Sequence, residues 1–180
     1  MEDEKIVHAG RDAAPGFAVR RAMESDARAI AGLLRAAFAE FEPLYTPAAF
    51  AATVIDEAGV LARLREGPLW VAERGSSIIG AVGVVRSGDR ITIRGMAVHP
   101  AARWLGAGKA LLDRAERFAA EARVCEVALD TTAFLDRAIG LYKASGFAFT
   151  GEMANPHGTE LLRMTKTLAP GPCVSALCAK

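Results

Sequence analysis

A short segment with two glycines and two cations is the part of this sequence best suited to bind an anion. It reads Arg103-Trp104-Leu105-Gly106-Ala107-Gly108-Lys109 and follows an apolar, strand-like stretch. The N–H groups in the first turn of a helix have no partner inside the helix, and the helix dipole adds positive potential there. Gly106 and Gly108 let a phosphate approach the backbone, while Arg103 and Lys109 supply charge. The segment therefore predicts a pyrophosphate-binding turn at the start of a helix.

Two better-known phosphate motifs do not fit this segment. A Walker loop needs glycine at the position of Arg103 and serine or threonine at the position of Ala110. A dinucleotide fingerprint that begins at Gly106 needs glycine or alanine at the position of Leu111. On this motif alone, a glycine-rich turn that binds nothing stays open as the alternative.

The elements that must position the turn follow from apolar periodicity and turn residues. Ser25-Asp26 is expected to cap a first helix that Glu42-Pro43 ends, and Gly59 is a candidate break in the second helix. Thr131 or Thr132 is a candidate cap for the last helix. The strands are predicted at 17–20, 69–73, 78–85, 90–98, 124–129, 147–150 and 161–165, and the later helices at 47–65, from the glycine turn to 123, and 134–145.

This order predicts a mixed α/β fold. Three antiparallel strands precede the glycine turn, and the strand–helix–strand unit around it requires a right-handed crossover and a parallel pair. A mixed sheet flanked by helices follows. We expect a flexible leader at 1–16, a single domain at 17–169 and a loose tail at 170–180.

Composition narrows the function classes. Hydrophobic residues make up 52% of the 180 residues, which favours a folded domain. The net charge of +1 argues against nucleic acid and anionic membranes as partners, and no apolar run is long enough to span a bilayer. The N-terminus is acidic and polar, so it does not resemble a secretory signal. Three scattered histidines and three cysteines predict no metal site, and reduced thiols and a cytoplasmic location are the favoured interpretation.

Two motifs carry a family resemblance. The pattern R-x-x-G-x-G after the V-x-P strand end resembles the acyl-CoA-binding motif of the GNAT superfamily, the GCN5-related N-acetyltransferases. The segment Ala138-Ile139-Gly140-Leu141-Tyr142-Lys143-Ala144-Ser145-Gly146-Phe147 is similar to the A-x-x-L-Y-x-x-x-G-F segment of many of these enzymes. The two motifs lie in the expected order, separated by one helix, one strand and one helix. The chain is identified as a member over residues 17–168.

The resemblance implies a fold of about seven strands flanked by four helices. It also implies an enzymatic activity. The activity is acetyl transfer from acetyl-CoA, as cosubstrate, to a primary amine of a small molecule, peptide or protein, by direct attack without a metal. The resemblance makes Tyr142 the acid that protonates the CoA thiolate, and the usual pKa values of phenol and thiol allow this transfer. The alternative is that the Tyr142 ring only packs. Asp130 matches a carboxylate that serves as general base in some relatives, and a solvated or capping aspartate is its alternative.

The same resemblance places the pantetheine of CoA between two separated strands. It implies backbone contacts from Met96, Ala97 and Val98, and Gly95 is a candidate for the bulge that separates the strands. An ordinary core strand is the alternative. The sequence departs from the family at three positions: Trp104 is often glycine, Leu135 is an asparagine in many relatives, and Thr92 is a glutamate in some.

The acceptor side is predicted less sharply. By resemblance its walls are the first two helices and the final hairpin. The acceptor amine is unidentified, and a homodimer is left open. A CoA-binding regulatory module with weak catalysis is the second functional hypothesis. The residues expected on the acceptor side are Glu40, Phe41, Glu42, Tyr45, Trp70 and the loop 152–159.

Overall fold

One sheet of seven strands organises the part of the chain that the structure, a computed structural model, describes, which is residues 16–168. The strand order is β1-β2-β3-β4-β5-β7-β6, and the β4–β5 pair is parallel while the other pairs are antiparallel. The strands are β1 (Ala18–Arg21), β2 (Leu69–Arg74), β3 (Ser77–Ser87), β4 (Arg90–Val98), β5 (Glu126–Thr131), β6 (Ala148–Ala154) and β7 (Leu161–Thr167).

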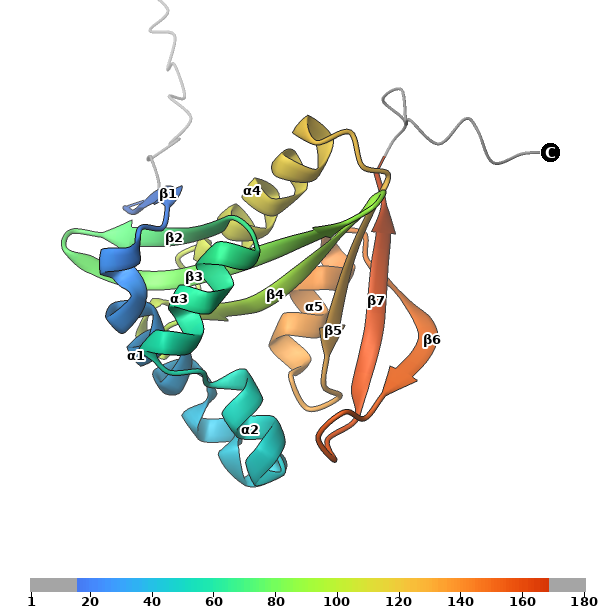
Figure 1. The fold of residues 1–180 in the computed structure, drawn as a ribbon, viewed down its shortest axis with the longest axis horizontal. Helices are drawn as coiled ribbons and strands as arrows, with labels where there is room; N and C mark the ends of the chain where they lie inside the picture. The colour runs from blue at the N-terminus through green and yellow to red at the C-terminus, as the bar shows by residue number, and fades with distance from the viewer. Residues whose placement is uncertain (1–15, 169–180) are drawn as a thin grey trace, which may run out of the picture.

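Five α-helices cover this sheet, with α1 and α3 on one face and α4 on the other (Figure 1). They are α1 (Ala27–Phe38), α2 (Pro47–Thr53), α3 (Glu57–Glu66), α4 (Ala107–Glu121) and α5 (Asp136–Ala144). The predicted mixed α/β fold and the order of its elements are confirmed.

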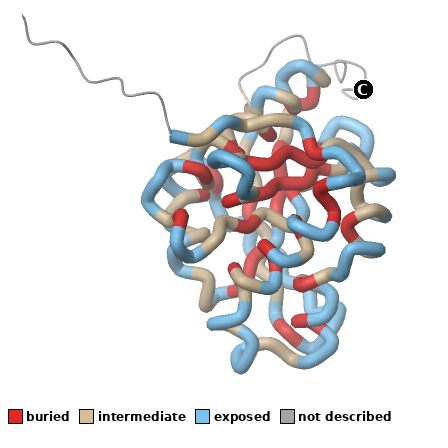
Figure 2. Tube along the Cα trace, turned by 90° about the vertical axis from the view of Figure 1, so that its left-hand side faces the viewer, coloured by how far each residue is buried: buried red, intermediate tan, exposed pale blue. Residues whose placement is uncertain are grey.

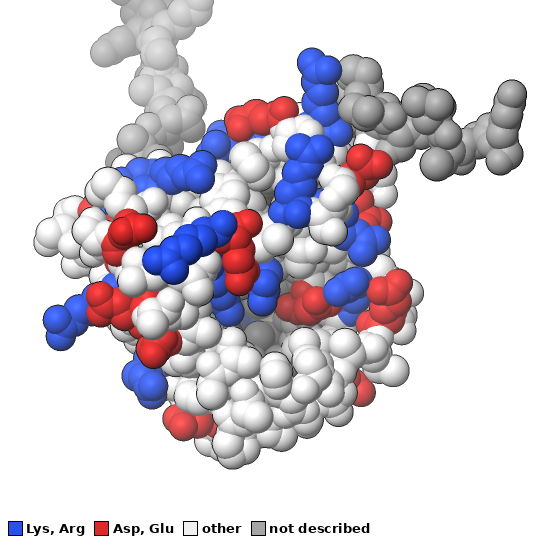
Figure 3. Space-filling model, in the orientation of Figure 1, with Lys and Arg blue, Asp and Glu red and all other residues white. Residues whose placement is uncertain are grey.

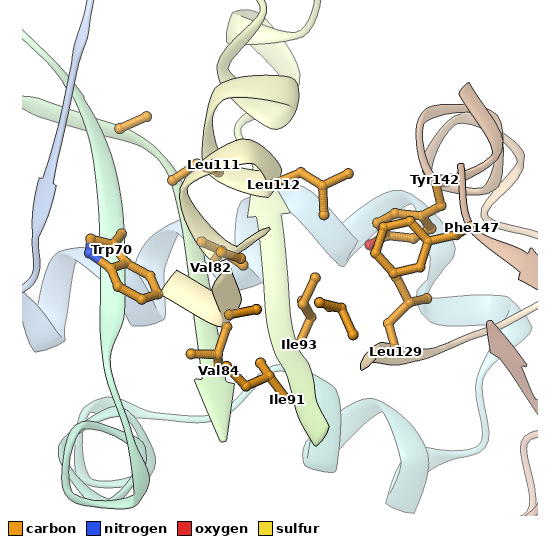
Figure 4. Close-up of a cluster of buried hydrophobic side chains, with 14 of the residues drawn as sticks. Trp70, Val82, Val84, Ile91, Ile93, Leu111, Leu112, Leu129, Tyr142 and Phe147 are labelled. Atoms are coloured by element: carbon orange, nitrogen blue, oxygen red, sulfur yellow. The ribbon is translucent and has the colours of Figure 1, made fainter. Parts of the chain in front are cut away.

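Both faces of the sheet are buried, so alternate residues of one strand enter different cores. Trp70 and Ala72 of β2 pack with α4, whereas Leu69 and Val71 pack with α1 and α3. Figure 2 shows the buried segments gathered in the interior, and Figure 4 shows the α4 side, where Leu111 and Leu112 lie over the strands. This two-sided burial explains why β2 and β3 are almost continuously apolar in sequence.

The sheet separates between its two central strands. The β4–β5 pairing runs only from Arg90, opposite Glu126, to Ile93, opposite Leu129. After Ile93 the two strands diverge, as Figure 1 shows below the point where they meet. Gly95 has a φ of +68° and, together with Met96, forms a bulge between the pairs Gly83–Arg94 and Ala81–Ala97. A bulged strand bends, and this bend turns β4 away from β5.

Three local predictions about helix ends are wrong. The predicted second helix is two helices, and the break lies before Asp56, whose carboxylate accepts a hydrogen bond from Gly59 N at 2.8 Å. Gly59 is therefore inside the first turn of α3. Asp26 does not cap α1, because its carboxylate is bound by Arg20 and by the backbone N of Met23.

The last helix also begins differently from the prediction. Neither Thr131 nor Thr132 caps α5, which starts at Asp136 after Leu135 without a side-chain cap. Cys125 is disulfide-bonded, so the prediction of reduced thiols is wrong for this residue. Cys173 and Cys178, like the predicted leader up to residue 15 and the predicted tail, lie outside the described residues.

Two further observations concern residues 16–168 alone. No helix there combines the length and the apolar character needed to cross a bilayer. No group of three or more histidine, cysteine, aspartate or glutamate side chains in that range has the arrangement of a metal site.

Candidate active site

A cavity of about 1000 Å³ opens where β4 and β5 diverge. Its walls come from both halves of the sheet, from the start of α4, from α5, and from the segment between α1 and α3. Figure 3 shows a hollow near the centre of this face, with basic and acidic side chains above and beside it and uncharged residues below it. The cavity therefore joins the turn before α4 to the side of the molecule on which α2 lies.

The turn before α4 has the geometry of an exposed helix N-terminus. Gly106 has a φ of +81°, and the first hydrogen bond of the helix runs from Ala110 N to Gly106 O at 3.0 Å. The N–H groups before Ala110 belong to residues that line the cavity. A Cβ atom on Gly108 would lie 3.2 Å from Leu141 Cδ2, so this glycine allows α4 and α5 to approach closely. An anion in the cavity would meet unpaired backbone donors here.

The cations around this turn differ in their surroundings. Arg103 forms an ion pair with Glu40 and donates to Ala37 O at 3.3 Å, so it ties the turn to the end of α1. Lys109 pairs with Asp113 one turn along α4, at 2.5 Å. Both of these charges are partly offset by a carboxylate.

Trp104 and Arg137 form a second exposed feature of the turn. Trp104 has a φ of +79° and is 87% exposed, and the Arg137 guanidinium lies 4.9 Å from the centre of its ring. The bulky residue at the position that is often glycine thus points away from the helix N-terminus. It leaves the backbone donors open.

Tyr142 of α5 faces the bulged end of β4. Its side chain is buried, and its hydroxyl donates to Met96 Sδ at 3.8 Å. The ring lies beside Phe147, with 6.0 Å between centroids, and Figure 4 shows the two rings together on one side of the core. Burial raises the pKa of Tyr142 to about 12. The phenol is therefore a neutral proton donor at neutral pH.

Asp130 lies at the end of β5 and lines the cavity, but its carboxylate is already engaged. Both oxygens accept hydrogen bonds from Arg163 of β7, each at 2.9 Å. This pairing raises the pKa of Arg163.

An aromatic cluster forms another part of the cavity wall. The Tyr45 and Phe134 rings meet edge to face at 4.9 Å, and Phe41 stacks on Phe134 at 6.1 Å. Burial raises the pKa of Tyr45, so its hydroxyl is also neutral. This part of the wall offers an apolar, ring-lined surface.

Comparison with known proteins gives the same assignment as the fold. The model of the family described as "Acetyltransferase (GNAT) family" matches residues 28–147. The chain belongs to the GNAT acetyltransferase family. It is 33% identical over 92 residues to the mouse protein "Probable N-acetyltransferase family 8 member 5" and 34% identical over 89 residues to the human "N-acetyltransferase 8B". These matches cover 48% and 46% of this chain, and the chain spans only 40% and 39% of those relatives.

Solved structures share the GNAT fold. The PaiA N-acetyltransferase from Thermoplasma acidophilum, determined in complex with coenzyme A, has a TM-score of 0.71 at 15% identity, covering 84% of this chain and 99% of that one. The ribosomal-protein-S18-alanine N-acetyltransferase from Escherichia coli also has a TM-score of 0.71 at 15% identity, with coverage of 86% and 96%. At such identity the likeness concerns the fold alone.

The cavity of this GNAT chain brings together most of the residues singled out from the sequence. Among the residues expected to be catalytic or to bind the cofactor, Leu105 alone does not line the cavity, and it is exposed. Glu42, expected on the acceptor side, does not line it either. Trp70 was expected on the acceptor side and is instead buried under α4 against Phe118, at 5.3 Å, so that expectation is wrong. The residues that line the cavity as expected are Met96, Ala97, Val98, Arg103, Trp104, Gly106, Ala107, Gly108, Lys109, Asp130 and Tyr142.

The lining residues of this GNAT site that were not expected from the sequence include Arg63, Phe134 and Arg137. Arg63 carried a usable signal, because it lies three residues after Val60 and so falls on the inward stripe of its helix. Phe134 and Arg137 had none, since Phe134 lies in the turn before α5 and Arg137 in the first turn of this short helix.

Proposed function

We propose that the protein transfers an acetyl group from acetyl-CoA to a primary amine by direct attack of the amine on the thioester. The observation that carries this proposal is the divergence of β4 and β5 beside the open N-terminus of α4, with the neutral hydroxyl of Tyr142 at the bulge. A strand edge without a partner, an anion site and a proton donor share one cavity.

The donor would occupy the β4 side of the cavity. Its pyrophosphate would be held by the backbone N–H groups of Gly106, Ala107 and Gly108, with Arg103 and Lys109 adding charge. The pantetheine would pair with the backbone of β4 at Met96, Ala97 and Val98, where β5 no longer does so. The exposed Trp104–Arg137 pair is well placed to flank the nucleotide end, since both side chains lie at the mouth beside the turn.

The transfer itself needs one proton to leave the amine and one to reach the sulfur. The amine nitrogen forms a bond to the thioester carbon, and the carbon–sulfur bond breaks as the tetrahedral intermediate collapses. An N–H group at the β4 bulge would stabilise the oxyanion. Tyr142 would give its proton to the departing thiolate, a role that burial supports by keeping the phenol neutral.

Asp130 is the candidate for the base that takes the proton from the amine. Its position at the cavity supports this role. Its two bonds to Arg163 support the alternative, in which the pair holds β5 against β7. Substitution of Asp130, considered below, separates the two.

The direct experiment measures binding and turnover separately. Thermal unfolding with saturating acetyl-CoA should show a stabilisation of about 2.7 kcal/mol at one hundred times the dissociation constant. Release of free CoA thiol across a panel of amines should then identify an acceptor. Absence of any stabilisation would remove the donor assignment, and stabilisation without thiol release on any amine would favour a CoA-binding regulatory module.

A further inference from the structure

Arg63 of α3 extends into the cavity and rests on the bulge of β4. Its Nη2 donates to Ala52 O at 3.3 Å, and a Cβ atom on Gly95 would overlap its Nη1. Gly95 is thus needed twice, for its positive φ and for the room it leaves the guanidinium. The neighbouring Met96 is the residue that Tyr142 contacts, so Arg63 and Tyr142 meet consecutive positions of the same bulge.

Arg63 forms no salt bridge within residues 16–168, although the charge of Glu66 raises its pKa and so offsets part of the effect of burial. Glu66, one turn along α3, forms its ion pair with Arg94 at 2.9 Å, and no carboxylate within residues 16–168 pairs with Arg63. Burial and the charge of Arg94 lower the pKa of Arg63, yet a guanidinium stays protonated in proteins. A partly buried cation with five N–H donors, one of which is bonded to Ala52 O, has capacity for an anionic ligand.

The carboxylates of the cavity do not compensate for this cation. Glu40 pairs with Arg103, and Asp130 pairs with Arg163. Asp136, the remaining acidic lining residue, is exposed in the first turn of α5. The cavity is therefore a poor match for a polycationic acceptor and a better match for one that carries a negative group.

The location of Arg63 separates this anion site from the one at the α4 turn. Gly95 lies three residues before Val98, which is about 10 Å along an extended strand, and the turn follows only after that. Arg63 is also bonded to Ala52 of α2, the helix that begins shortly after Tyr45, whose ring lies against Phe134. The site next to it is the end of the cavity where an acceptor must enter.

We propose that Arg63 binds a carboxylate of the acceptor, so that the substrates are primary amines that also carry a carboxylate, with an apolar side chain against the aromatic cluster. This inference rests on the proposed acetyl transfer and names the acceptor class of the same site. A guanidinium fork matches a carboxylate in geometry and charge, and the aromatic rings match an apolar group. Free amino acids with apolar side chains have all three features.

The test compares matched acceptors and matched variants of the full chain. The acceptors are leucine, methionine, phenylalanine, tyrosine and tryptophan, each paired with its amide, which keeps the amine and the side chain but lacks the negative charge. With saturating acetyl-CoA, the wild-type protein should show a kcat/KM at least tenfold higher for one or more of these acids than for the matching amide. Equal values for every acid and its amide would overturn the inference and leave the acetyltransferase proposal intact.

Variants of two arginines on α3 locate the preference. Arg63→Gln should remove the preference for the acid, mainly through a higher KM, and leave the amide unchanged, while Arg63→Lys should restore part of it. Arg65→Gln is the matched control, because Arg65 has the same charge on the same helix but is exposed and does not line the cavity. An equal effect of Arg63→Gln on acid and amide would contradict carboxylate recognition. Stabilisation by acetyl-CoA in each variant shows that it is folded.

A binding measurement keeps the inference testable without turnover. Calorimetric titration of the CoA-bound protein with the same amino acids should show binding in the wild-type protein and in Arg65→Gln, and at least tenfold weaker binding in Arg63→Gln. If every amine fails to release thiol although acetyl-CoA stabilises the protein, the acetyltransferase proposal fails. If the amino acids also fail to bind the wild-type protein, the inference about Arg63 fails independently.

Discussion

The Tyr142 hydroxyl and the Met96 sulfur lie 3.8 Å apart, and this contact joins α5 to the bulged end of β4. It is the place where the two sequence motifs meet in space, because Met96 precedes the glycine turn and Tyr142 lies in the second motif. A thioether is a weak hydrogen-bond acceptor, so the phenol loses little hydrogen-bond energy when a thiolate replaces the Met96 sulfur as its partner. The phenol is therefore available to donate its proton to a stronger acceptor, such as a thiolate.

Replacement of Tyr142 by phenylalanine should lower kcat by one hundredfold or more if the phenol protonates the thiolate, since positioned acids typically contribute this much. The ring is retained, and its packing against Phe147 should persist. Steady-state rates and calorimetric binding of CoA make the measurement, and the dissociation constant for CoA should change less than threefold. Unchanged kcat would remove the acid role.

The raised pKa of Tyr142 should also appear in the stability at high pH. Its folded-state pKa of about 12 exceeds the unfolded value of about 10, so the unfolded state loses the phenolic proton first. The contribution is fully present below pH 10 and is lost as pH rises from about 10 to 12. The loss should approach 2 to 3 kcal/mol, since each pKa unit corresponds to about 1.4 kcal/mol. Chemical denaturation at pH 9 and pH 11.5 measures it, and Tyr142→Phe should lose that much less stability over the same interval.

Asp130→Asn should lower kcat/KM less than tenfold, because both carboxylate oxygens are engaged by Arg163. The variant keeps one acceptor for that arginine and removes the basic group. The pH dependence of kcat/KM is the decisive measurement. Disappearance of an acidic limb from this profile, together with a loss of one hundredfold or more, would instead identify Asp130 as the base.

Two glycine-to-alanine changes should shift stability in opposite directions. Gly32 lies in the interior of α1 with no atom within 4 Å of a built Cβ, so Gly32→Ala should raise the free energy of unfolding by about 0.5 to 1 kcal/mol. Gly106 also has open space around it, but its φ is +81°, and Gly106→Ala should lower the same quantity by about 1 to 2 kcal/mol. Denaturant titration of both variants checks the signs, and a stabilised Gly106→Ala would contradict the left-handed geometry of the turn.

The sequence predicts most of this fold because each element has a local signal. The helix after the glycine turn starts at Ala107, inside the predicted segment, and β4 has the predicted bounds of Arg90 and Val98. The break between α2 and α3 was placed at Gly59 because a glycine lowers helix propensity. It lies instead before Asp56, whose side chain caps the new helix, and aspartate is a residue type that favours this position.

The candidate site could be predicted on its donor side and not on its acceptor side. Backbone groups and glycines bind the same part of CoA in many proteins, so the turn from Arg103 to Lys109 is readable from residue types. Acceptor contacts depend on which side chains converge from distant elements. Arg63 and Phe134 are 71 positions apart in the chain and line the same cavity, and no short sequence motif predicts that they do so.

Within residues 16–168, the four residue pairs between β4 and β5, with the adjacent bond from Cys125 N to Asp89 O, are the backbone connection between the two halves of the sheet. The two halves, β1–β4 and β5–β7, are thus paired at one end of the central strands and separated at the other. A ligand that lies along β4 would add hydrogen bonds in the gap between the two halves. Amide hydrogen exchange should then slow at Met96, Ala97 and Val98 when CoA is bound, and the two halves should open together where the free protein opens each separately.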